Sequence, residues 1–272
     1  MNRSLLITLG LAMAPGLALA DGAGICQAQS NMQTGALIEL YTSEGCSSCP
    51  PADHWFGQMA ANADPKQLSL LAFHVDYWDS LGWPDRFARH AYTERQSRRV
   101  RATGSTTIYT PQVMLSSALG LHWYQPDAVA AALSQGQPLP AKVRIDLGAH
   151  PEDSHWRVTV KATVVAPIST HAELYLALYE NDLISKVKAG ENSGATLHHD
   201  RVVRGFWGPW PMTANSAAQD LRVTLPNDAK LANSGLTAFV QDSANGETLQ
   251  ALSLPLAPCN TLTPVQLPPA SR

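Results

Sequence analysis

The 272-residue chain has 19 Lys and Arg residues against 22 Asp and Glu residues, which gives a formal net charge of −3 at pH 7. This mildly acidic balance argues against a nucleic-acid partner or an anionic membrane surface. Hydrophobic residues make up 45% of the sequence, enough for a packed core, and the length suits one large domain or two small ones.

The first twenty residues have the parts of a secretory signal peptide. Arg3 supplies a positive charge, "LLITLGLAMAPGLA" is apolar, and residues 18–20 form a small-x-small cleavage site. The alternative is an uncleaved anchor, but the apolar run is shorter than the roughly 20 residues that a membrane span needs, and a Pro-Gly pair interrupts it. We therefore expect a periplasmic or secreted mature chain that begins near Asp21 and has no stable membrane span after signal cleavage.

The next part of the chain alternates between strand and helix signals. Short apolar runs rich in β-formers predict buried strands, and prolines mark the first turns of two helices. The resulting β-α-β-α-β-β-α order is what a central sheet with helices on both faces requires. The predicted strands cover 36–42, 68–76, 111–117 and 119–124, and the predicted helices cover 50–63, 84–100 and 125–136.

Beyond Pro140 the pattern changes to short alternating segments such as "AKVRIDLG", "HWRVTVKATVV" and "LTAFVQD", with turn residues between them. Such segments are typical of an antiparallel β-sandwich. We therefore expect an α/β domain over 21–138, an all-β, sandwich-like domain over 139–260, and a disordered tail over 261–272.

Four cysteines, an even number in an exported chain, indicate disulfide bonds. Three pairings are possible. The simplest joins Cys46 to Cys49 and Cys26 to Cys259, because the last two lie near the chain ends. In the chain-entropy model, a loop as long as that between Cys26 and Cys259 contributes on the order of 5 kcal/mol to stability.

Cys46 and Cys49 fall at the start of the first predicted helix. Unpaired N–H groups and the positive end of the helix dipole favour a thiolate at Cys46, and Cys49 follows one turn later and less exposed. These positions suit a nucleophile and a resolving thiol. Cys46 would attack a substrate disulfide, and Cys49 would displace the product from the mixed disulfide.

Two other roles remain open for this pair. One is an inert structural disulfide. The other is a zinc or copper half-site, in which His74 would be a third ligand. Zinc usually needs four ligands, and no second Cys or His pair in the sequence has suitable spacing. We therefore expect neither a metal ion nor another cofactor.

The stretches "ELYTSEGCSSCPPAD" and "YTPQVML" resemble the thioredoxin superfamily. Together with "FHVDYWDSLGWPDRF" and "GENSGATLHHDRVVR" they resemble the DUF1223 family of exported bacterial proteins. The resemblance implies a thioredoxin-like fold for the first domain, oxidoreductase activity, Cys46 as attacking thiol and Cys49 as resolving thiol. It also implies a cis peptide bond at Pro111, facing the cysteines, which would turn the Thr110 backbone toward a substrate. The Ser-Ser dipeptide departs from thioredoxin itself, so redox direction and potential do not transfer.

The segment "FHVDYWDSLGWPD" follows the second predicted strand and should lie at the carboxyl edge of the sheet, beside the cysteines. A histidine there could stabilise the Cys46 thiolate, and a buried aspartate could accept the proton of Cys49. The aromatic residues could form a wall for a peptide, or the segment could be a packed structural loop. The candidate groove or supporting residues are Glu44, His74, Asp76, Trp78, Asp79 and Thr110.

Two further segments are rich in charge. The arginines of the helix predicted at 84–100 read as a solvated basic face, with an anion site as the alternative. In "GENSGATLHHDRVVR", adjacent histidines on a strand point to opposite faces, so they rarely share a metal ion. We expect instead a polar network near the cysteines, formed by Glu191, Asn192, His199, Asp200 and Arg204.

The sequence as a whole predicts thiol–disulfide exchange with the thiols or disulfides of exported proteins. The competing hypotheses are a non-catalytic module that binds a peptide or ligand and uses its cysteines as a staple, and a copper-handling protein.

Overall fold

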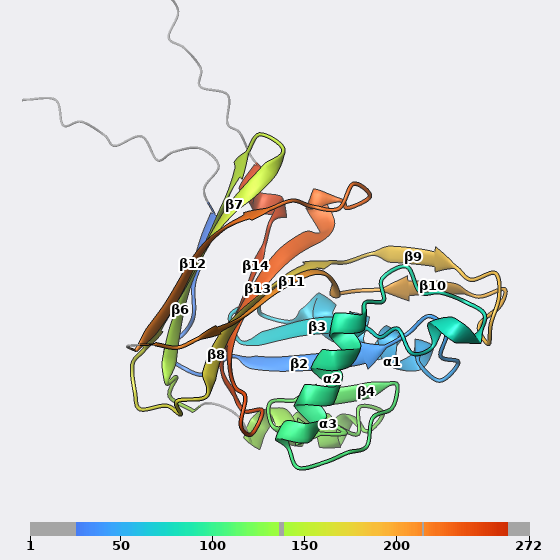
Figure 1. Ribbon diagram of the computed structural model, residues 1–272, viewed down its shortest axis with the longest axis horizontal. Helices are drawn as coiled ribbons and strands as arrows, with labels where there is room; N and C mark the ends of the chain where they lie inside the picture. The colour runs from blue at the N-terminus through green and yellow to red at the C-terminus, as the bar shows by residue number, and fades with distance from the viewer. Residues whose placement is uncertain (1–25, 136–138, 214, 261–272) are drawn as a thin grey trace, which may run out of the picture.

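The computed structural model describes residues 26–135, 139–213 and 215–260 (Figure 1). The predicted signal peptide and the predicted C-terminal tail lie outside these residues. No helix within the described ranges is long and apolar enough to cross a membrane.

The largest sheet has eight strands, which come from both halves of the sequence (Figure 1). Strands β2 (Ala36–Thr42) and β3 (Leu68–His74) are parallel and lie near its middle. A parallel contact between β3 and β11 (Val202–Pro211) joins the two halves: Val202 lies opposite Ala72, and the Ala72 N–H donates to the Arg201 carbonyl at 2.8 Å. The sheet order is β14 (Thr248–Pro255), β13 (Ser234–Asp242), β8 (Ala172–Glu180), β11 (Val202–Pro211), β3 (Leu68–His74), β2 (Ala36–Thr42), β4 (Gln112–Leu115) and β5 (Ala118–Leu119).

The predicted fold class, an α/β thioredoxin-like domain followed by an all-β sandwich, is wrong. The described residues form fourteen strands and only three α-helices, and the chain is mostly β. The strands around the cysteine loop continue, across β3 and β11, into strands of the second half. Hydrophobic periodicity identifies a strand but does not identify its neighbours, so the sequence alone concealed this junction. The residue ranges proposed for the domains stay a prediction.

Two smaller sheets complete the β structure. A four-stranded antiparallel sheet packs its apolar side chains against one face of β8, β13 and β14, forming the largest core. Its order is β1 (Cys26–Gln29), β6 (Val143–Glu152), β7 (His155–Val164) and β12 (Ser216–Val223). The third sheet is a hairpin of β9 (Leu183–Lys186) and β10 (Thr196–His199), which extends from the main sheet toward α1 (Figure 1).

The helices cover both faces of β2 and β3. Helix α1 (Pro50–Asn62) begins with two prolines, which suit a first turn because its N–H groups have no intrahelical partner. Side chains of α1 and α3 (Pro126–Gln135) pack on one face of the strands, and those of α2 (His90–Ala102) pack on the other. Coverage on both sides explains why β2 is apolar almost without alternation. Short 3₁₀ helices cover Asp79–Leu81, Leu231–Asn233 and Ala257–Asn260.

One carboxylate, that of Glu39, is fully buried in the middle of β2. It accepts hydrogen bonds from Arg95 of α2 at 2.8 Å and from Gln241 of β13 at 3.0 Å, and Arg99 Nε lies 3.4 Å away. Burial raises the pKa of Glu39, but the two guanidinium groups and the Tyr41 hydroxyl outweigh that effect and lower the pKa to about 2. The carboxylate is therefore ionised at neutral pH.

The arginines of α2 do not all form the predicted solvated face. Arg95 and Arg99 are buried, at 2% and 5% exposure, and serve as counter-charges to Glu39. The Arg95 guanidinium also lies over four aromatic rings, with 4.9–5.2 Å from its central carbon to the ring centroids of Phe73, Tyr175, Phe206 and Phe239. The solvated-face prediction is wrong for these two residues because a buried carboxylate on β2 attracts them.

The predicted disulfide between Cys26 and Cys259 is confirmed. Its Cα atoms lie 5.2 Å apart, and the two cysteines are 233 residues apart in sequence. The bond joins β1 to the last 3₁₀ turn of the described chain and flanks the largest core.

We expect Glu39→Gln to lower the free energy of unfolding by about 3–5 kcal/mol, because it leaves two buried guanidinium groups without a charged partner. Urea unfolding at neutral pH, with the disulfides intact, measures this. The matched control is Glu94→Gln, since Glu94 is an exposed acid whose contact with Arg98 is 4.0 Å; it should change stability little. Equal effects of the two substitutions would contradict the role given to Glu39.

Candidate functional site

The Cys46 loop, residues 43–49, connects the end of β2 to the start of α1, and its two cysteines form the predicted disulfide with Cα atoms 5.4 Å apart. Cys49 is the N-cap of α1, so Cys46 lies in the turn before the helix rather than within its first turn. Both cysteines have an exposed fraction of 0%, whereas Ser47 and Ser48 between them are exposed. The expected difference in exposure between the two cysteines is therefore absent in the disulfide form.

Thr110 and Pro111 precede β4, next to the strand that leads into the Cys46 loop. The expected cis peptide bond between them is present. The antiparallel register pairs Tyr41 of β2 with Gln112, so Pro111 falls near the carboxyl end of β2. Trp78 connects the two segments: its Nε1 donates to Thr110 Oγ1 at 2.8 Å. Trp78 also packs closely against Gly45: a Cβ added at Gly45 would lie only 3.1 Å from the Trp78 Cβ.

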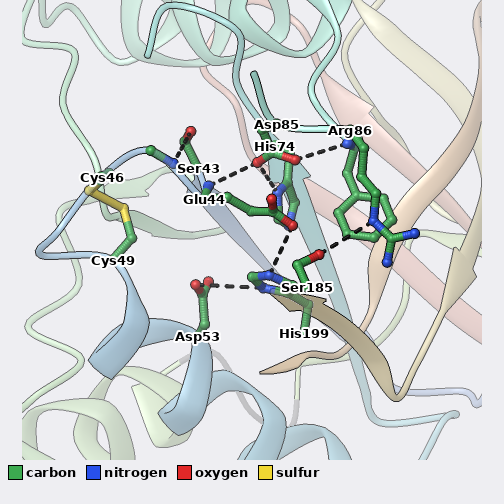
Figure 2. A network of polar contacts seen from close by, with 12 residues as sticks. Ser43, Glu44, Cys46, Cys49, Asp53, His74, Asp85, Arg86, Ser185 and His199 are labelled. Carbon is green, nitrogen blue, oxygen red and sulfur yellow. Dashed lines mark hydrogen bonds and ion pairs between the residues drawn. A yellow bond between two sulfur atoms is a disulfide. The ribbon is translucent and has the colours of Figure 1, made fainter. Parts of the chain in front are cut away.

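His74 and Asp85 form a buried pair beside the Cys46 loop (Figure 2). His74 Nδ1 donates to Asp85 Oδ2 at 2.6 Å, and the same oxygen accepts the backbone N–H of Glu44 at 2.9 Å. Burial lowers the pKa of His74, but the adjacent carboxylate raises it more, and the net shift is upward. Burial raises the pKa of Asp85, but His74 and two backbone N–H groups lower it to about 2. The contact therefore favours the charged forms of both groups, the imidazolium and the carboxylate.

A second imidazole, that of His199 on β10, lies between two carboxyl groups (Figure 2). Its Nε2 is 3.5 Å from Glu44 Oε1, and its Nδ1 is 3.7 Å from Asp53 Oδ2 on α1. The rings of His199 and His74 contact each other edge to face, with centroids 5.0 Å apart. The two histidines and the three acidic residues around them are each at most 7% exposed. We call Glu44, Asp53, His74, Asp85 and His199 the buried acid–imidazole cluster.

The two carboxyl groups beside His199 differ in their affinity for a proton. Burial raises the pKa of Asp53 by more than His199 and His74 lower it. Burial also raises the pKa of Glu44, but its interactions with the neighbouring His199, Ser185 and Trp83 side chains outweigh that effect, so the net shift is downward. Trp83 Nε1 donates to Glu44 Oε2 at 2.7 Å. The pKa values of the two carboxyl groups are therefore shifted in opposite directions, that of Asp53 upward and that of Glu44 downward.

The segment between β9 and β10 holds the Cys46 loop from outside. Asn192 Nδ2 donates to the carbonyls of Glu44 and Cys46 at 2.9 and 3.0 Å, and Glu191 Oε2 accepts the Ser47 N–H at 3.1 Å. Glu191, Asn192 and His199 thus lie at the cysteine loop, as the sequence predicts for this polar network.

The other two predicted members of that network lie apart from the loop. Asp200 accepts the backbone N–H of Asp182 and lies against Gly57 of α1. Arg204 pairs with Glu180 and Asp228.

The acidic residues predicted for the groove fall in two places. Asp79 Oδ1 accepts the Asp85 N–H at 3.0 Å, behind the His74 pair, and burial raises the pKa of Asp79. Asp76 lies beyond the end of β3 and accepts from Thr93 and His90 at the start of α2. Asp76 thus supports α2 rather than the cluster.

Asp53 is the residue that sequence reasoning missed. It lies four positions after Cys49 on the first helix, and side chains with this spacing lie on one helix face. The spacing was therefore a usable signal. His199 was identified only as part of a network, because its contact with Asp53 depends on the position of the β9–β10 hairpin.

Metal binding receives no support from the geometry. Within residues 26–135, 139–213 and 215–260, no three His, Cys, Asp or Glu side chains are arranged to hold a metal ion. Two of the three ligands of the copper hypothesis, Cys46 and Cys49, are joined to each other in a disulfide.

Comparison with known proteins gives a family and two similar folds. The sequence matches the family described as "Protein of unknown function (DUF1223)" over residues 37–241. The crystal structure of protein AGR_C_4864 from Agrobacterium tumefaciens has 23% identity and a TM-score of 0.55, with 84% of this chain and 96% of that chain covered. HBP35 of Porphyromonas gingivalis has 13% identity and a TM-score of 0.63, with 89% and 81% covered.

The two structural likenesses show a shared fold, and a search of curated proteins found no match. The family match covers well over half of the sequence. The chain therefore belongs to the DUF1223 family.

Proposed function

We propose that this protein carries out thiol–disulfide exchange with exported proteins through Cys46 and Cys49. The observation that carries the proposal is a Cys-x-x-Cys disulfide at the start of a helix, next to a buried cluster of carboxyl and imidazole groups. Groups with shifted pKa values concentrate where proton transfer is needed, although structural networks also shift them. The position of Pro111 near the carboxyl end of β2 supports the proposal, because the thioredoxin resemblance implies a proline near a redox pair.

The exchange has two steps. The Cys46 thiolate attacks one sulfur of a substrate disulfide, forms a mixed disulfide and expels the first substrate thiolate. The Cys49 thiolate then attacks Cys46 Sγ, closes the 46–49 bond and expels the second substrate thiolate. Two electrons pass from the cysteine pair to the substrate, and the reverse sequence oxidises a substrate dithiol.

The roles of the two thiols follow from their surroundings. Cys46 lies before the helix, and its Sγ is 3.4 Å from Ser48 Oγ, a hydroxyl that could donate to a thiolate. Cys49 precedes Asp53 by one turn, and a carboxyl group with a raised pKa is a suitable acceptor for its proton. Since both sulfurs are buried in the disulfide form, the exposed Ser47–Ser48 turn must open to admit a substrate.

The location of the protein is part of the same proposal. Two disulfide bonds are typical of proteins outside the cytoplasm, where thiols are not kept reduced. Together with the signal-like first twenty residues, they support a periplasmic or secreted location.

A second candidate function is a binding module in which the 46–49 disulfide is a staple. The full burial of both sulfurs favours it, because structural disulfides are normally inaccessible. The two candidates differ in whether the reduced cysteines react with a disulfide.

In the reduced protein, we expect iodoacetamide at mildly acidic pH to label Cys46 before Cys49. The helix N-terminus and the Ser48 hydroxyl stabilise the first thiolate, and a buried carboxyl group disfavours the second. Peptide mapping after short labelling times measures the order. Faster labelling of Cys49 would reverse the assigned roles.

We expect Cys49→Ser to leave Cys46 joined to its substrates, because the resolving thiol is gone. Reducible adducts should form in periplasmic extracts, and Cys46→Ser should form none. The wild-type protein is assayed in parallel on a model disulfide. If no variant forms adducts and the wild type neither reduces nor oxidises the model disulfide, the binding module becomes the better description.

A further inference from the structure

The His199 side chain is buried between two carboxyl groups but has no short hydrogen bond. Its exposed fraction is 2%, and neither ring nitrogen has a hydrogen-bond partner of good geometry among the described residues. The contacts to Glu44 and Asp53, at 3.5 and 3.7 Å, are ion-pair distances at or beyond the hydrogen-bond limit. A buried polar group of this kind requires an explanation, and contacts that tighten during a reaction provide one.

Asp53 connects this histidine to solvent. Besides facing His199, it lines a groove of about 470 Å³ between α1 and β10, together with His54, His198 and Asp200. The cluster therefore has one member, Asp53, at the groove and another, Glu44, beneath the Cys46 loop. His199 lies between them (Figure 2).

We infer that His199 is the proton store of the cysteine pair, a role that rests on the proposed thiol–disulfide exchange. When Cys49 loses its proton to the Asp53 carboxylate, His199 Nδ1 takes that proton and restores the carboxylate. The imidazolium so formed is stabilised by Glu44 on its other side. The proton later returns to Asp53 and leaves through the groove, so that no charge stays uncompensated in the interior.

The charges around His199 favour this transfer. Glu44 and Asp53 contact it directly, and His74 contacts its ring edge to face. His74 is already paired with Asp85, so the positive charge on the first imidazole is balanced locally and Glu44 is left to balance the second. Phe87 packs against both rings and excludes water from that side.

His199 acts through Asp53 and does not contact a sulfur in any interaction described above, so it is a positioning residue rather than a catalytic one. Its effect should therefore appear in the pH dependence of the second step, the closure of the 46–49 bond. The first step, attack by Cys46, should not depend on it.

The test mixes reduced protein with oxidised glutathione in excess, quenches with acid at intervals, and counts the mixed disulfide by mass spectrometry. We expect His199→Gln to slow closure about a hundredfold near neutral pH, the range for loss of general acid–base assistance. The rates of variant and wild type should converge above about pH 9, where Cys49 ionises without help. The matched control is His171→Gln, an exposed histidine just before β8 that lines neither the groove nor the buried acid–imidazole cluster; both steps should keep their wild-type rates.

The outcomes separate the two proposals. If wild-type Cys46 does not react with glutathione disulfide, the proposed function fails. If the wild type reacts and His199→Gln closes at the wild-type rate, or is slowed equally at every pH, the proton-store inference is overturned. If His199→Gln does not fold, Glu44→Gln takes its place, because it removes the stabilising carboxylate but leaves Asp53; closure with an unchanged pH profile would again overturn the inference.

Discussion

The carboxylate of Glu39 accepts charged hydrogen bonds in a place that water does not reach, and three elements are fixed around it. Arg95 and Arg99 bring α2 onto the sheet, and Gln241 brings β13 from the other half of the chain. Leaving any one of these charges unpaired in the interior costs several kcal/mol, whereas neutralising all of them together costs far less. The ion cluster therefore determines which elements pack together, in addition to any net stability it provides.

Strand β2 and the loop that follows it contribute to two buried charge clusters. Glu39 lies in its middle, facing α2, and Glu44 follows its carboxyl end, beneath the Cys46 loop. The first cluster is closed: short hydrogen bonds fix its carboxylate in one state. The second contains one tight pair, His74 with Asp85, and one loosely held imidazole, His199, whose two carboxyl neighbours have pKa values shifted in opposite directions. A rigid cluster near a looser one is the arrangement expected when a stable scaffold supports a site where protons move.

Local features of the sequence predicted local structure well. The strand at 36–42 and the helix that begins at Pro50 follow from apolar runs and proline placement, and both are present with nearly those bounds. Both disulfides followed from cysteine number and position. The sheet order did not, because the β3–β11 contact joins segments with no mutual signal in sequence. The burial of Arg95 was hidden for the same reason: its partner charge is on another element.

The candidate site shows the same division. The cysteines, Glu44 and His74 lie in short sequence motifs. Asp53 could have been predicted from its four-residue spacing to Cys49. His199 could not be assigned a contact without the β9–β10 hairpin, which places residues of the second half against a loop of the first. The site is thus assembled from distant segments.

The bridge between Cys26 and Cys259 imposes an order on assembly. A ribosome makes the chain from its N-terminus, so Cys26, Cys46 and Cys49 all exist before Cys259 does. Until almost the whole sequence has been made, Cys26 has only the wrong partners available. Cys46 and Cys49 are only three residues apart, so they can pair with each other early. Once they are paired, neither is available to Cys26. In a compartment that oxidises thiols before Cys259 appears, closure of this pair leaves Cys26 without a wrong partner.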